Sequence, residues 1–189
     1  MSISIDAAEA LVVAVMAFFG APFFVLGLVL LGRGALRDAG PIFLACGGLN
    51  GILGLFLLFL SLQAGGGVGI AIASLVLIFA TTWVSAGIVA MRGYDAAPLG
   101  SLGLFYGITM VPFAVFLWQD PLGFGRIWLT MNAILWLWVF FTLPLAFLFK
   151  VISAKVAGWS FLVEAFITLW IPAAIIIIGS VVSPPFNLP

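Results

Sequence analysis

Histidine is absent from the sequence, cysteine occurs once, and charged residues are few. Without histidine, neither a serine–histidine catalytic pair nor a histidine-ligated metal site can be assembled. The chain also lacks a neighbouring pair of carboxylates for acid–base chemistry and a glycine motif that would cradle a phosphate. The single cysteine, Cys46, cannot form an internal disulfide. We therefore expect no catalytic residues, no metal site and no cofactor.

The six basic and six acidic residues cancel, so no net field attracts nucleic acid. Charged residues make up 6% of the chain and hydrophobic residues 66%, whereas a soluble domain carries about 25% charged residues. Mean hydropathy is +1.41. These values indicate an integral membrane protein whose surroundings are the lipid bilayer. Because the opening MSISIDAAEA has no early basic residue, we expect the first apolar segment to be retained rather than cleaved as a signal peptide.

Charged residues divide the apolar sequence into runs long enough to cross a bilayer, which takes about 20 residues of helix. The uncharged run 39–91 is too long for one crossing, and the glycine cluster QAGGGVG at 63–69 divides it. We therefore predict an all-α integral membrane protein in which residues 1–189 form one domain, a six-helix transmembrane bundle. The expected helices lie near 10–32, 41–62, 68–91, 99–118, 127–149 and 158–181.

The basic residues are distributed unevenly between the two sides of this bundle. The termini and the second and fourth loops contain one basic residue, Arg126. The first, third and fifth loops carry the others: Arg33, Arg37, Arg92, Lys150 and Lys155. The positive-inside rule then predicts that the first, third and fifth loops are cytoplasmic and that both termini lie outside.

Three of the basic residues, Arg33, Arg92 and Lys150, each end an expected helix and are spaced 59 and 58 residues apart. The chain is thus expected to form three helical hairpins, each folded over a basic turn. Ancestral triplication would produce this spacing, and so would any regular six-helix bundle; the sequence favours neither explanation.

One carboxylate, Glu164, lies within the last apolar run, GWSFLVEAFITLWIPAAIIIIG. Placing such a group in hydrocarbon costs roughly 2.5–3.5 kcal/mol on insertion scales. It could reach water at the helix end or pair with Lys150 or Lys155. Alternatively, it could face a water-filled path, since Thr168 and Pro172 continue its stripe. Proline has no N–H, so the Thr168 carbonyl would be freed to form a ladder of acceptors with Glu164 and the Thr168 hydroxyl.

Aromatic side chains predict the opposite wall of such a path. Trp136 and Phe140 share one helix face, and the first helix shows a comparable line of Met16, Phe19 and Phe23. If these faces meet, they form a narrow slot that admits a flat neutral molecule and excludes hydrated ions. Such stripes are also typical of packing or lipid-facing surfaces. Thr81 and Ser85 share a helix face and are further, weaker candidates to line the path. The polar residues Asn50 and Tyr106 also lie inside expected helices, and we interpret them as packing contacts.

The stretch VEAFITLWIPA resembles the last helix of the AmiS/UreI family, the urea and short-chain amide channels. Upstream, Trp136, Thr142, Lys150 and Glu164 fall in register with a family Trp, Thr, Lys and Glu. The segment GYDAAPLGSLGLFYGITMVPFA and the GGL at 47–49 are similar to the middle of the family. The resemblance covers most of the chain and is weakest in the first helix.

This resemblance implies a homohexamer in a bacterial inner membrane. Each protomer would have its own pore, with passive conduction of urea or small amides such as acetamide and formamide. It maps the family's pore Trp and Glu onto Trp136 and Glu164. The chain departs from the acid-gated members in having Phe140 for a second pore Trp, and Thr81 and Ser85 for a Phe and a Tyr. Those members also carry histidines in long outer loops, so we expect no gating by outside pH between about 5 and 7.

Two other functions are compatible with the sequence. In the first, Glu164 takes up and releases a proton in a proton-coupled transporter of small solutes. In the second, the chain is a non-conducting membrane subunit in which Glu164 pairs with a lysine.

Overall fold

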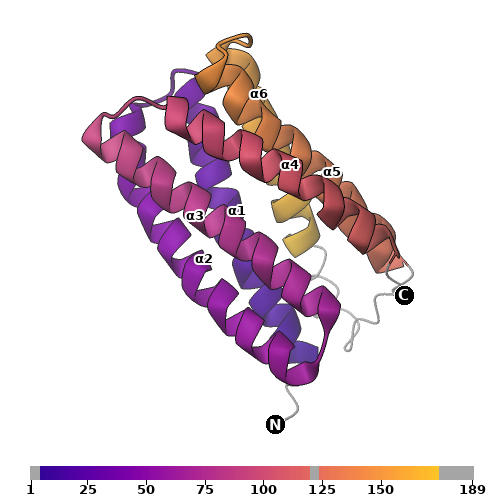
Figure 1. Cartoon of the computed structure of the whole chain (residues 1–189). Helices are drawn as coiled ribbons and strands as arrows, with labels where there is room; N and C mark the ends of the chain where they lie inside the picture. Colours follow the sequence, from indigo (N-terminus) through magenta and orange to yellow (C-terminus); the bar gives the residue numbers. More distant parts are fainter. Residues whose placement is uncertain (1–4, 120–123, 175–189) are drawn as a thin grey trace.

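The computed structural model describes residues 5–119 and 124–174, and these residues are helical almost throughout, with no strand among them (Figure 1). The helices are α1 (Ile5–Leu30), α2 (Leu36–Ala64), α3 (Gly67–Arg92), α4 (Ala97–Gln119), α5 (Phe124–Leu143) and α6 (Ala154–Glu164). The π-helical segment η1 (Pro144–Leu148) continues α5, and a second one, η2 (Ala165–Trp170), continues α6. The structure confirms the predicted all-α, six-helix fold.

Two helices, α2 and α6, begin earlier than the sequence analysis expected. α2 begins at Leu36 rather than near 41, because Pro41 removes one backbone donor near the start of the helix without ending it. α6 begins at Ala154 rather than near 158, because the Ser153 hydroxyl caps it and accepts a hydrogen bond from the amide of Val156 at 3.3 Å. The expected end of the last helix, near 181, lies outside the described residues.

The helices have the length and composition of membrane spans. Five segments of the described chain qualify: Leu36–Gln63, Gly69–Arg92, Ala97–Phe116, Thr130–Leu148 and Ala154–Ala174. α1 adds a shorter apolar stretch, Ala14–Leu30. Since all backbone groups of a helix are hydrogen-bonded within it, such segments can cross hydrocarbon. The chain is a multi-pass membrane protein.

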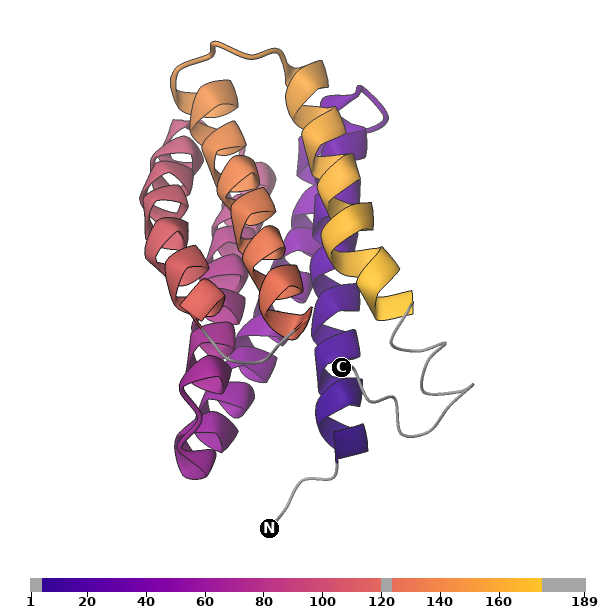
Figure 2. The same cartoon turned by 90° about the vertical axis from the view of Figure 1, so that its right-hand side faces the viewer.

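The basic turns lie together at one end of the bundle. Figures 1 and 2 show the α1–α2 turn, the α3–α4 turn and the connection from η1 to α6 at this end, and the α2–α3 turn and the start of α1 at the other. We call it the basic end, because it brings together Arg33, Arg37, Arg92, Lys150 and Lys155. This clustering is the charge pattern on which the predicted orientation depends.

The tightest helix packing does not follow the hairpins over the basic turns. α2 packs most extensively against α3, α4 against α5, and α1 against α6 and η2. Figure 2 shows α4 beside α5 and α1 beside α6. Across the basic turns, α3 meets α4 and α5 meets α6 over much shorter lengths, whereas α1 packs against α2 about as extensively as against α6 alone. The bundle therefore consists of three close helix pairs, with the protein interior between them.

Small residues explain why α2 and α3 approach so closely. On α2 they recur every seventh position: Gly40, Gly47, Gly54 and Ser61. A Cβ added at Gly47 would lie 2.7 Å from the backbone nitrogen of Val84 and 3.0 Å from the carbonyl oxygen of Ala80. Backbones packed this closely gain van der Waals contact that lipid tails cannot replace. The sequence repeat thus holds one pair as a rigid unit.

Adjacent glycines on α2 provide a matched test of this packing. We expect Gly47→Ala to lower the free energy of unfolding in detergent by about 1–3 kcal/mol, because the added methyl meets backbone that must move. Gly48 is the control, since an added Cβ there has no atom within 4 Å. Chemical unfolding in mixed micelles measures both variants, and equal stability of the two would contradict the close approach.

Candidate functional site

Aromatic rings from three helices meet around Phe79 on α3. The centre of the Phe79 ring lies 5.2 Å from that of Phe19 and 5.7 Å from that of Phe23, both on α1. It lies 5.2 Å from Trp136 and 4.9 Å from Phe140, both on α5. Phe79 is only 3% exposed. The predicted aromatic lines of α1 and α5 therefore meet across a third ring, on a helix where the sequence analysis singled out Thr81 and Ser85 instead.

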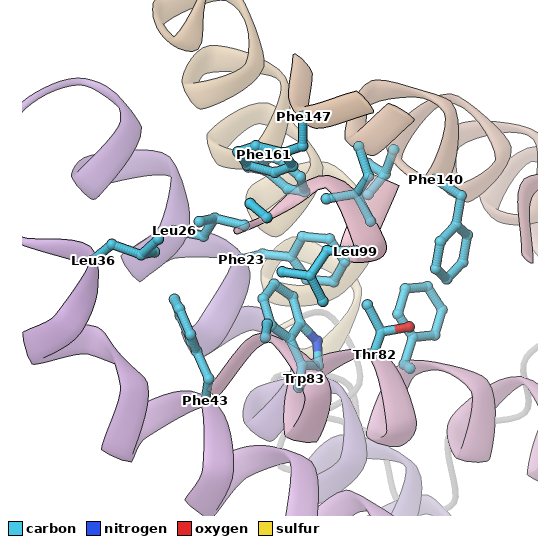
Figure 3. A pocket seen from close by; sticks show the side chains of 15 residues that line it. Phe23, Leu26, Leu36, Phe43, Thr82, Trp83, Leu99, Phe140, Phe147 and Phe161 are labelled. Carbon is cyan, nitrogen blue, oxygen red and sulfur yellow. The ribbon is translucent and has the colours of Figure 1, made fainter. Parts of the chain in front are cut away.

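A narrow cavity lies between these rings and the basic end. It extends to Leu36 at the start of α2, Leu99 in the first turn of α4 and Phe147 near the end of η1. Its free volume is about 30 Å³, on the order of two water molecules. Figure 3 shows the lining side chains, which include seven aromatic rings: Phe23, Phe43, Phe79, Trp83, Phe140, Phe147 and Phe161. The cavity is therefore small and lined almost entirely by apolar side chains. We call it, together with its rings, the aromatic constriction.

Two hydrogen bonds, which join Trp136, Thr168 and Glu164, connect α5 to α6 and η2 beside the aromatic cluster. The indole N–H of Trp136 donates a hydrogen bond to the Thr168 hydroxyl oxygen at 3.2 Å. That hydroxyl in turn donates to the backbone carbonyl of Glu164 at 2.9 Å. The Trp136 ring also packs edge-on against Phe79, with ring planes at 78°. These contacts place the hydrogen-bonded residues Trp136 and Thr168 next to the aromatic cluster around Phe79.

Glu164 is 2% exposed, and its Oε1 has no hydrogen-bond partner. Lys150 and Lys155, with which the sequence allowed it to pair, are both exposed at the basic end. A buried carboxylate oxygen without a partner is costly in an apolar protein interior. It offers a free acceptor to a molecule that carries N–H groups.

The backbone is irregular directly after Glu164. η2 begins at Ala165 and ends two residues before Pro172, which cannot supply the N–H that a regular helix needs. Such wide helical turns are frequent at functional sites. The predicted ladder of three acceptors needs a correction, because the Thr168 hydroxyl donates to the backbone carbonyl of Glu164 and accepts from Trp136. The side-chain acceptor of this group that has no partner among the described residues is Oε1 of Glu164.

The remaining predicted site residues lie in different surroundings. Phe23 and Phe140 line the cavity, whereas Met16 is buried in the apolar core and does not line it. Thr81 is exposed, with its hydroxyl 2.8 Å from that of Tyr106 on α4. Ser85 is half-buried and is not among the residues that line this cavity.

Other residues of α3, not Thr81 and Ser85, face the cavity. Thr82 and Trp83 line the cavity together with Phe79, so the inner face of α3 is aromatic where the sequence analysis expected a loss of aromatic bulk. The four-residue spacing of Phe79 and Trp83 could have indicated this face. Asn50 is another surprise, because it is fully buried and its side-chain amide makes no hydrogen bond, unlike the packing contact expected.

Comparisons with known proteins agree with one another. The model of the AmiS/UreI family of transporters matches residues 11–180. A protein of Mycolicibacterium smegmatis, described as an amidate substrates transporter, is 30% identical over 86% of this chain and 75% of its own length. A protein of Rhodococcus erythropolis, described as the transporter AmiS2, is 29% identical over 89% of this chain and 80% of its own length.

Solved structures show the same fold. The crystal structure of the Helicobacter pylori urea channel superposes with a TM-score of 0.76 at 22% identity. The cryo-electron microscopy structure of that channel in its closed state gives 0.77 at 21% identity. Each comparison covers 88% of this chain and 97% of the other. At this level of identity the likeness concerns the fold alone.

The hydrogen bond between Trp136 and Thr168 can be tested by removing its acceptor. Thr168→Val keeps the side-chain shape, and Thr109→Val is the control, because the Thr109 hydroxyl also donates to a carbonyl of its own helix, that of Phe105. We expect T168V to lower the free energy of unfolding by roughly 0.6–2 kcal/mol more than T109V, the usual range for a hydrogen bond between membrane helices. Unfolding in mixed micelles measures the difference, and equal losses would count against an interhelical bond.

Proposed function

Because the chain belongs to the AmiS/UreI family of transporters, we propose that it is a passive membrane channel for urea or small amides such as acetamide and formamide. Membership of this family places it among transporters rather than enzymes. The observation that carries the choice of solute is the buried Glu164, whose Oε1 has no partner beside the hydrogen-bonded Trp136 and Thr168. Urea and amides carry N–H donors that would replace lost water by bonding to this acceptor.

The proposed path runs from the basic end through the aromatic constriction toward Glu164. Phe161 lines the cavity, and Glu164 lies three residues further along α6, about 4.5 Å at 1.5 Å per residue. A flat neutral solute can pass between aromatic rings, whereas a hydrated ion would lose its water without finding replacement ligands. Trp136, Phe140, Phe19 and Phe23 would form the walls around this step.

Orientation and assembly are part of the proposal. We place the basic end in the cytoplasm and both termini outside a bacterial inner membrane, supported by the clustering of basic residues at that end. The family resemblance suggests that the single six-helix domain, 1–189, is the protomer of a homohexamer in which each protomer has its own path.

Stopped-flow swelling of vesicles that contain the purified protein tests conduction. We expect faster swelling than in protein-free vesicles with urea, acetamide and formamide, at a rate that a transmembrane pH difference does not alter. Swelling should also be the same at outside pH values of about 5 and 7, since the chain has no histidine to titrate there. Rates no higher than those of protein-free vesicles would overturn the channel, and a sharp switch in this pH range would overturn the absence of gating.

A proton-coupled transporter is the second candidate, favoured by the same buried carboxylate, whose Oε1 has no partner. Glu164→Gln distinguishes the two functions, with the exposed Asp38→Asn as control. For a channel, we expect E164Q to lower solute flux about tenfold through loss of one strong acceptor, and the unmodified protein never to accumulate solute. Accumulation driven by a proton gradient, and its loss in E164Q, would establish the transporter instead. Unchanged flux in E164Q would remove Glu164 from the path.

A further inference from the structure

One residue that lines the cavity carries a hydrogen-bond donor that no described residue satisfies. Among its lining residues, only Thr82 and Trp83 carry a side-chain nitrogen or oxygen. The Thr82 hydroxyl donates its hydrogen to the carbonyl of Ile78 at 2.9 Å. The indole nitrogen of Trp83 is buried and has no hydrogen-bond partner. A buried N–H is almost always paired in a native protein, so a partner from outside the described residues is expected.

Neighbouring rings hold the Trp83 indole in one orientation. Phe23 meets it edge-on, with ring centres 4.9 Å apart and planes at 85°. Phe43 packs against it at 5.4 Å with planes at 37°. Figure 3 shows the indole nitrogen on the edge of the ring that faces Thr82. The N–H therefore has a fixed direction within an otherwise apolar constriction.

We propose that the Trp83 indole N–H binds the carbonyl oxygen of an amide solute in this cavity, which makes Trp83 a specificity-determining residue of the path. The proposal rests on the proposed conduction of urea or amides. An amide has one strong acceptor, its carbonyl oxygen, and N–H donors on the other side of the same carbon. Trp83 supplies the donor for the first, and Glu164, further along the path, supplies the acceptor for the second.

The lining also decides which amides fit best. Apart from this one donor, the cavity offers side-chain carbon and the Thr82 hydroxyl oxygen. A solute with two amino groups, such as urea, leaves more N–H donors without acceptors here than a solute with a methyl group in place of one of them. Since unpaired polar groups are costly in apolar surroundings, the site favours short-chain aliphatic amides over urea.

Exchanging the atom that accepts the hydrogen bond tests the role of Trp83. Acetamide and thioacetamide differ in one atom, and the sulfur of thioacetamide is larger than oxygen and accepts hydrogen bonds weakly. We expect Trp83→Phe to lower the ratio of acetamide to thioacetamide flux about fivefold, the effect of losing one neutral hydrogen bond. Trp138→Phe is the control, because Trp138 is exposed on the outer face of α5. An unchanged ratio in W83F, including an equal loss for both solutes, would overturn the proposal.

A binding measurement separates this inference from conduction itself. In the unmodified protein, acetamide should shift the indole N–H resonance of Trp83 downfield, and the signal is assigned by its absence in W83F. If this shift occurs while vesicles show no amide flux, the binding role stands and the channel is overturned. If amides are conducted and the resonance does not move, the channel stands and the role of Trp83 is overturned.

Discussion

A polar group inside a bilayer must find its hydrogen-bond partner within the protein, because hydrocarbon offers none. The helices meet this requirement for the backbone, and two hydrogen bonds meet it for the Trp136 indole and the Thr168 hydroxyl. Several buried side-chain groups do not meet it among the described residues, the amide of Asn50 being one. Two of them belong to the proposed path: Oε1 of Glu164 accepts nothing, and Nε1 of Trp83 donates to nothing. One is an acceptor and the other a donor. An amide could pair with both, because it has N–H donors for the first and a carbonyl acceptor for the second.

The packing of the bundle explains how such a site can lie between helices. Glycines allow close backbone contact within the pairs, as at Gly103 of α4, where an added Cβ would lie 2.8 Å from the carbonyl oxygen of Phe140. Between the pairs, the interior is filled by large rings instead. Phe79 comes from the α2–α3 pair, Phe140 from the α4–α5 pair and Phe23 from the α1–α6 pair. Rigid pairs joined through aromatic side chains form a slot whose width the rings determine.

The irregular segments lie next to residues of the candidate site. η1 begins at Pro144, one turn after Phe140, and η2 begins directly after Glu164. A wider turn changes which residues face inward from that point of the helix. The Thr168 hydroxyl donates to the carbonyl of Glu164, as threonines of regular helices also do, and it accepts from the indole of Trp136. The sequence analysis had expected this hydroxyl to be part of a ladder of acceptors.

The sequence by itself determined the membrane environment, the six helices and the clustering of basic residues, because hydropathy and charge act locally along the chain. It also identified Glu164 as unusual, since a buried carboxylate is costly wherever it lies, and it singled out Trp136 by the face that it shares with Phe140 and by the family resemblance. Only the tertiary structure decided that Phe79 and Trp83, rather than Thr81 and Ser85, face the interior, and that the close pairs differ from the hairpins over the basic turns. In a helix that is apolar on all sides, hydrophobic periodicity carries little information about direction. The inner face is set by where neighbouring backbones can approach, and that depends on glycines and rings distributed over the whole chain.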